Sequence, residues 1–101
     1  MSRLNRDQLI AAATENLGAT PDPSGNADLV FDRGSIVVAA DANDFKGAFK
    51  RLKKNVDGYR WALINKEDLF AANTLSIGSK AGMITSDGTV LKNADIPRKK
   101  A

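Results

Sequence analysis

The feature that most constrains the fold is a strongly amphipathic helix that leads directly into an apolar strand within residues 41–64. Four apolar residues recur at helical spacing (i, i+4, i+7 and i+11): Phe45, Phe49, Leu52 and Val56. Asp41 precedes this pattern in the position of an N-terminal cap, and residues 59–64 continue with the alternation of a β-strand. A helix with one apolar stripe is stabilised by packing that stripe on another layer, so this segment predicts a helix lying on a sheet.

A second helix is predicted near the N-terminus, where Asn5 and Gln8 have the spacing of a capping box. This helix is expected over residues 6–17 and should end at Gly18, because glycine adopts the left-handed conformation without a Cβ penalty. A short helix is expected after Asn65. Short β-branched or apolar runs between turn signals predict further strands over residues 29–31, 35–40, 74–77, 82–85 and 89–91.

This order of elements predicts an α+β domain in which the two main helices pack on one face of a mostly antiparallel sheet, followed by a C-terminal β-ribbon and a basic tail. The length suits a single domain over residues 1–101, with a folded core at 1–96 and a flexible tail at 97–101. No apolar run approaches the roughly 20 residues of a membrane-spanning helix, so no membrane contact is expected. The first residues also lack the pattern of a secretory signal, which predicts a cytoplasmic or intracellular protein.

The chain contains neither cysteine nor histidine. This excludes thiolate nucleophiles, disulfides, zinc fingers and imidazole general bases. Asp22, which follows a proline, combines with Asp44 and Lys46 into a loose nuclease signature. That chemistry needs the second acid on a strand, whereas Asp44 is predicted to open a helix. We therefore expect no enzyme activity, no cofactor and no bound metal ion.

Positive charge is concentrated on the predicted helix and the strand after it. Residues 45–60 contain six cationic side chains and one carboxylate, whereas the whole chain has a formal net charge of only +3. Together with the tail, these positions are the candidate contacts for nucleic acid or another anionic partner: Lys46, Lys50, Arg51, Lys53, Lys54, Arg60, Arg98, Lys99 and Lys100. Surface lysines are usually only solvated. However, no acidic residue lies between Lys46 and Lys54 to form the i, i+4 pairs of an ordinary charged helix, which favours an anionic partner.

Three uncharged residues beside the basic positions each have two interpretations. Tyr59 and Trp61 share one face of the predicted strand, from which aromatic rings can stack on bases. Trp61 is better explained as a core residue packed against Phe49 and Leu52. That leaves Tyr59 as the stacking candidate. Gly47 interrupts the basic helix at a cost of about 1 kcal/mol relative to alanine, which is either tolerated or keeps the helix surface open to a partner.

These features predict a small non-enzymatic binding module whose basic helix contacts nucleic-acid phosphates with little sequence specificity. The alternative is a protein–protein interaction or assembly component, such as a small accessory or structural protein of a larger particle, that docks on an acidic protein surface. Binding to nucleic acid is expected to weaken steeply with salt. A gel shift with single-stranded and duplex probes separates the two interpretations.

Overall fold

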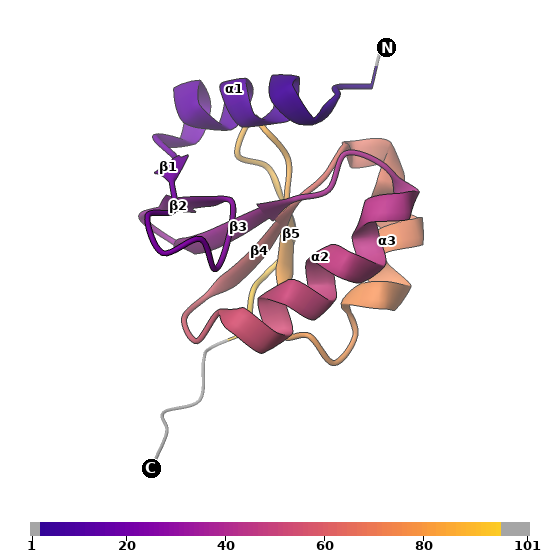
Figure 1. The fold of residues 1–101 in the computed structure, drawn as a ribbon. Helices are drawn as coiled ribbons and strands as arrows, with labels where there is room; N and C mark the ends of the chain where they lie inside the picture. Colours follow the sequence, from indigo (N-terminus) through magenta and orange to yellow (C-terminus); the bar gives the residue numbers. More distant parts are fainter. Residues whose placement is uncertain (1–2, 96–101) are drawn as a thin grey trace.

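The computed structural model describes residues 3–95 of the 101-residue chain. Within that range the elements follow one another as α1 (Arg6–Leu17), β1 (Thr20–Pro21), β2 (Leu29–Phe31), β3 (Gly34–Val38), α2 (Ala42–Asn55), β4 (Arg60–Leu63), the 3-10 helix η1 (Lys66–Asp68), α3 (Leu69–Ser76), β5 (Gly82–Ile84) and β6 (Val90–Lys92) (Figure 1). None of the helices in residues 3–95 has the length and apolar character needed to cross a membrane.

The strands form one mixed sheet in the order β1-β2-β3-β4-β5-β6, with β1 and β6 at its two edges. The β1–β2, β2–β3 and β5–β6 pairs are antiparallel, whereas β3, β4 and β5 run parallel to one another. Parallel neighbours need a crossover connection, and here α2 joins β3 to β4 while η1 and α3 join β4 to β5. The predicted α+β class, the mostly antiparallel sheet and the C-terminal ribbon are confirmed.

The helices cover both faces of the sheet, with α1 on one face and α2 and α3 on the other (Figure 1). Successive residues of a strand point to opposite faces. In β3, Ile36 and Val38 belong to the core under α1, whereas Val37 belongs to the core under α2. The prediction that both main helices share one face is wrong, because the central strands are apolar on both faces and each face needs a helix to cover it.

Trp61 lies in the core on the α1 face. Its ring meets that of Phe31 edge-on, with the ring centroids 6.2 Å apart, and its Nε1 donates to the Arg33 carbonyl at 3.0 Å. The prediction that Trp61 is a core residue is confirmed, since it is only 5% exposed. The predicted packing against Phe49 and Leu52 is wrong, because those two side chains lie in the core on the opposite face.

The capping residues predicted from the sequence are found at the ends of α1 and at the start of α2. The Asn5 side chain accepts from the Gln8 N–H, and the Gln8 carboxamide oxygen accepts from the Asn5 N–H, both at 2.9 Å, which confirms the capping box. Gly18 ends α1 in the left-handed conformation with φ 67°. Asp41 caps α2 by accepting from the Asn43 N–H at 2.9 Å.

Residues 74–77, predicted as a strand, form the end of α3 and its cap. The inward positions of α3 have helical spacing: Leu69, Ala72 and Ser76. Ile77 follows in an extended conformation, and Gly78 then turns the chain with φ 85°. The strand prediction is wrong because the β-branched residues in this stretch obscured the helical spacing of the inward positions.

Candidate partner-binding surface

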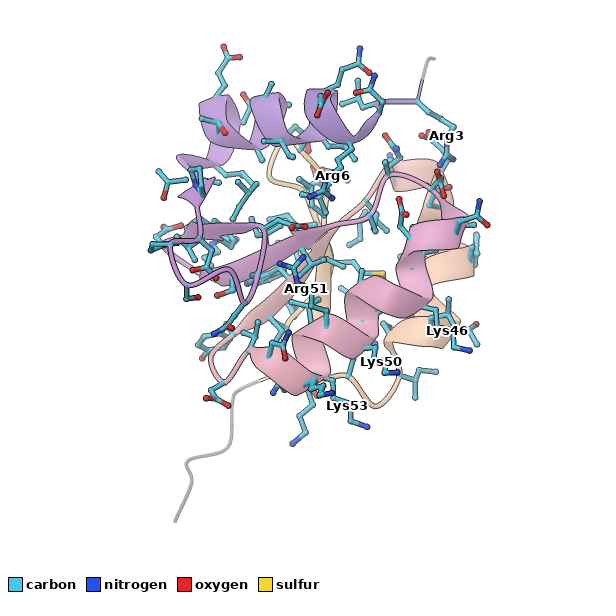
Figure 2. The ribbon with its side chains drawn as sticks, viewed as in Figure 1. Arg3, Arg6, Lys46, Lys50, Arg51 and Lys53 are labelled. Carbon is cyan, nitrogen blue, oxygen red and sulfur yellow. The ribbon has the colours of Figure 1, made fainter. Side chains whose placement is uncertain are left out.

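The α2 helix lies on the sheet with its apolar stripe inward and its lysines outward. The inward residues are buried as predicted: Phe45, Phe49, Leu52 and Val56. Four exposed lysines form what we call the lysine face: Lys46, Lys50, Lys53 and Lys54. Figure 2 shows Lys46, Lys50 and Lys53 following one another along the outer side of α2. Part of the predicted site is therefore presented to solvent on a single helix.

Arg51 projects from the other flank of α2 and is held by the protein itself (Figure 2). Its Nη1 donates to Asp28 Oδ1 at 2.7 Å, and its Nη2 donates to the Gly25 carbonyl at 3.0 Å. Arg6 of α1 approaches the same carboxylate at 3.1 Å. The Val38 N–H of β3 donates to the other carboxylate oxygen at 2.8 Å. Asp28 thus links the helices of both faces to the sheet. The Arg51 side chain is bound within this cluster and does not point freely into solvent like the lysines.

The Asp28 carboxyl is shielded from solvent, and the groups around it favour its charged form. Burial raises its pKa, but the backbone hydrogen bond from β3 and the two guanidiniums outweigh that effect, so the pKa lies below the ordinary value of an aspartate. The Asp28 side chain is 11% exposed, whereas those of Arg51 and Arg6 are 34% and 52% exposed. The acid is therefore satisfied by bases that remain partly hydrated.

Arg60 is also engaged within the chain. Its Nε donates to the Val56 carbonyl at 2.7 Å, and its Nη2 donates to the Lys53 carbonyl at 3.3 Å. Carbonyls at the end of a helix have no intrahelical donor, so the guanidinium caps α2 and complements its dipole. Nη1 reaches the Ser79 carbonyl at 3.5 Å. Arg60, predicted as a partner contact, thus stabilises the end of α2.

Three of the arginines take part in ion pairs, which distinguishes them from the lysine face. Three ion pairs found among residues 3–95 join an arginine to an aspartate: Arg3–Asp68, Arg6–Asp28 and Arg51–Asp28. None of these three pairs involves the lysine face. The predicted tail contacts Arg98, Lys99 and Lys100 lie outside the described residues. The exposed ammonium groups of the lysine face are therefore not used in these three ion pairs, unlike the Arg51 guanidinium.

A shallow hollow of about 210 Å³ lies between α2 and the end of α3. Its lining includes Lys46, Phe49, Lys50 and Lys53 from α2 and Leu75, Ile77, Gly78 and Ser79 from the end of α3 and the turn after it. Leu75 is 41% exposed and Ile77 is 72% exposed. We call Leu75 and Ile77 the apolar wall of the hollow. It was not predicted from the sequence, because residues 74–77 were expected to form a strand. The helical spacing of the inward α3 residues is the signal that would have found it.

Tyr59, the predicted stacking residue, lines a different hollow of about 400 Å³ together with Arg33 and Trp61. The two hollows share no lining residue. The Tyr59 side chain is 42% exposed. Tyr59 therefore stays a stacking candidate, but on a surface separate from the hollow between α2 and α3.

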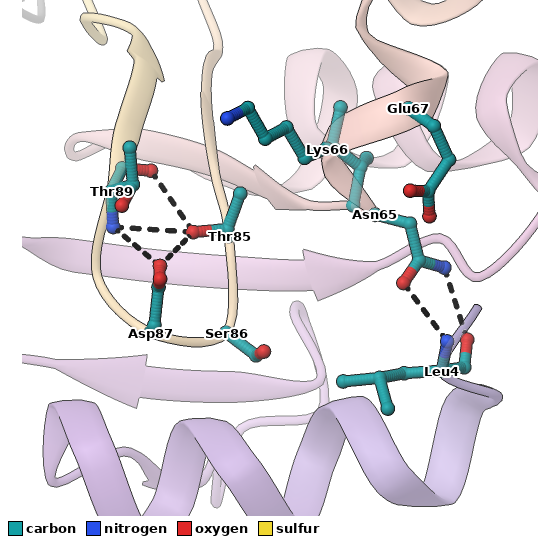
Figure 3. Close-up of a pocket in the computed structure, with 9 residues that line it drawn as sticks. Leu4, Asn65, Lys66, Glu67, Thr85, Ser86, Asp87 and Thr89 are labelled. Atoms are coloured by element: carbon teal, nitrogen blue, oxygen red, sulfur yellow. Dashed lines mark hydrogen bonds between the residues drawn. The ribbon is translucent and has the colours of Figure 1, made fainter. Parts of the chain in front are cut away.

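A pocket of about 300 Å³, whose lining includes the polar residues Asn65, Thr85 and Asp87, lies beyond the carboxyl ends of β4 and β5 (Figure 3). The Asn65 carboxamide accepts from the Leu4 N–H at 3.1 Å and donates to the Leu4 carbonyl at 3.0 Å. The Thr85 hydroxyl donates to the Asp87 carboxylate, which also accepts from the Thr89 N–H. These two bonds lower the pKa of Asp87, the Thr85 bond most. The polar groups thus anchor the N-terminal segment and close the β5–β6 turn.

The nuclease signature is not assembled into a site. Asp22 accepts from the Ser24 N–H and hydroxyl in a local turn, and Asp44 lies in the first turn of α2. Among residues 3–95, no group of three or more histidine, cysteine, aspartate or glutamate side chains is placed to hold a metal ion.

Comparisons with protein-family models, curated proteins and solved structures find no match, so the proposed function rests on this chain's own residues.

Proposed function

We propose that this protein is a small non-enzymatic binding module that holds an anionic macromolecule against the lysine face. The observation that carries the proposal is a contrast within α2: Arg51 is paired with Asp28, whereas the exposed lysine face takes part in none of the three ion pairs found among residues 3–95. Like charges close together on one helix repel one another. A partner that brings negative charge relieves this repulsion.

Two classes of macromolecule supply the required charge, nucleic acid through its phosphates and protein through an acidic surface. Nucleic acid is the class predicted from the sequence. Lysines interact with phosphates as point charges, so little sequence preference is expected. Four lysine–phosphate contacts correspond to a loss of affinity of about 100-fold between about 50 and 200 mM salt.

The test measures binding of labelled polyanions by fluorescence anisotropy at increasing salt. The probes are a single-stranded oligonucleotide, a duplex and polyglutamate. The double variant Lys50→Glu/Lys54→Glu reverses two charges of the lysine face. We expect the wild type to bind at least one probe at low salt and the double variant to bind it roughly tenfold or more weakly.

A matched control is Lys66→Glu/Ala11→Glu/Thr14→Glu, which makes the same change in net charge at three exposed positions outside α2 and outside the hollow that Tyr59 lines. Circular dichroism verifies that both variants are folded. The control should retain most of the wild-type affinity. The proposal is overturned if no polyanion binds the wild type at low salt, or if the lysine-face variant and the control variant lose affinity equally.

A further inference from the structure

The hollow between α2 and α3 combines two kinds of chemistry on one surface. Lys46, Lys50 and Lys53 form a row of about 10 Å along α2, as their i, i+4 and i+7 spacing dictates. Across the hollow, the aliphatic side chains of Leu75 and Ile77 are exposed. Exposed apolar side chains bordered by charged ones are typical of a surface that contacts another protein.

The exposure of Ile77 is a fixed property of the turn that ends α3. The Ser79 hydroxyl donates to the Ser76 carbonyl at 2.5 Å, and the Ser76 hydroxyl accepts from the Lys92 ammonium at 2.8 Å. Both serines are buried, and Gly78 between them has φ 85°. Since the residues on both sides are anchored, the chain holds Ile77 outward before any partner arrives.

The apolar wall distinguishes between the two classes of anionic partner. A nucleic-acid backbone would neutralise the lysines but leave Leu75 and Ile77 in water, because its phosphates and sugars are polar. A protein segment that carries carboxylates beside an apolar side chain can pair with the lysines and also cover Leu75 and Ile77. Burial of the exposed aliphatic groups then adds to the electrostatic attraction.

We infer that this hollow binds an acidic protein segment that carries at least one apolar side chain. The inference rests on the proposed function, because it identifies the anionic partner of the lysine face. The carboxylates of the segment pair with the row formed by Lys46, Lys50 and Lys53, and its apolar side chain packs against Leu75 and Ile77.

The test compares two labelled peptides of equal length and charge, one with two leucines set among glutamates and one with serines in place of the leucines. We expect the leucine peptide to bind the wild type roughly tenfold more tightly, because part of a leucine side chain leaves water. The Ile77→Ser variant should lose this preference. The matched control is Phe70→Ser, which removes a side chain of α3 that is 89% exposed and does not line the hollow.

The inference is overturned if the two peptides bind equally, or if Ile77→Ser and Phe70→Ser have the same effect. It is also overturned if phosphatidylglycerol vesicles bind in an Ile77-dependent manner while neither peptide binds. The single-stranded oligonucleotide serves as a second probe, whose affinity Ile77→Ser should leave unchanged. Polyanion binding that still depends on Lys50 and Lys54, without any leucine preference, would refute this inference and leave the proposed function standing.

Discussion

Replacement of Asp28 by asparagine is expected to destabilise the protein, because the Asp28 carboxylate is the point at which α1, α2 and β3 are joined. Its two oxygens accept from Arg51 and from the Val38 N–H, and Arg6 lies 3.1 Å away. Asparagine keeps the size of the side chain but offers one oxygen and an NH₂ group. In the variant the NH₂ group therefore faces either the Val38 N–H or both arginines, so at least one of the three donors loses its acceptor.

The magnitude follows from the hydrogen bonds that are lost. Hydrogen bonds to charged groups contribute about 1.5–3 kcal/mol each. The bonds from the arginines count for less, since Arg51 and Arg6 are 34% and 52% exposed and their charges remain hydrated after the substitution. We therefore expect Asp28→Asn to lower the free energy of unfolding by about 2–3 kcal/mol at neutral pH. In a domain of this size that corresponds to a decrease in Tm of roughly 10–20 °C.

The effect should depend on pH with a definite sign. The pKa of Asp28 is lower in the folded protein than in the unfolded chain, so its stabilisation is complete above the unfolded value of about 4. It is lost as the pH falls through the lower, folded pKa. The difference between wild type and Asp28→Asn should therefore be largest at neutral pH and shrink on acidification. Urea unfolding followed by the fluorescence of Trp61, the single tryptophan, measures both quantities.

Asp32→Asn provides the control, because Asp32 is an exposed aspartate in the β2–β3 turn with no ion pair to the described residues. It should change the free energy of unfolding by less than about 0.5 kcal/mol. Equal losses in the two variants would contradict the role assigned to Asp28. A difference between wild type and Asp28→Asn that stays constant down to low pH would contradict its electrostatic origin.

Replacement of two glycines by alanine should change the free energy of unfolding in opposite directions. Gly34→Ala places a Cβ 2.4 Å from the Tyr59 carbonyl oxygen at a residue with φ 134°, so a loss of about 2–4 kcal/mol is expected in the same urea assay. Gly47→Ala adds a Cβ that meets nothing within 4 Å inside α2, so a gain of about 1 kcal/mol is expected. Gly47 lies beside Arg51 and outside the hollow between α2 and α3, so peptide affinity should not change; reduced affinity would place the partner on the Arg51 flank.

Local chemistry made part of this structure predictable. Both helix caps depend on residues within three positions of each other, and the inward stripe of α2 follows from the helical period alone. The same period puts the lysines of α2 on its exposed side. The lysine face could therefore be predicted from sequence without knowledge of the fold.

The rest depends on contacts between distant residues. The face on which α1 packs, and with it the partners of Trp61, is set by how β3, β4 and β5 pair, which local patterns do not reveal. Arg51 had the same local signature as the lysines, yet it pairs with Asp28, a residue 23 positions away. The apolar wall of the hollow was hidden because a short β-branched stretch satisfies both strand and helix patterns.

The edges of the sheet affect how a partner can be recognised. Edge strand β1 has two residues, one of them Pro21, which has no N–H to donate, and edge strand β6 has three residues with an irregular register against β5. Recruitment by strand addition needs a long row of free backbone groups, which neither edge strand offers. If the protein binds a partner as proposed, recognition therefore depends on side chains of the helices. Such a surface can be retuned by a few substitutions at exposed positions, so partner choice can change while the hydrogen-bonded sheet stays the same.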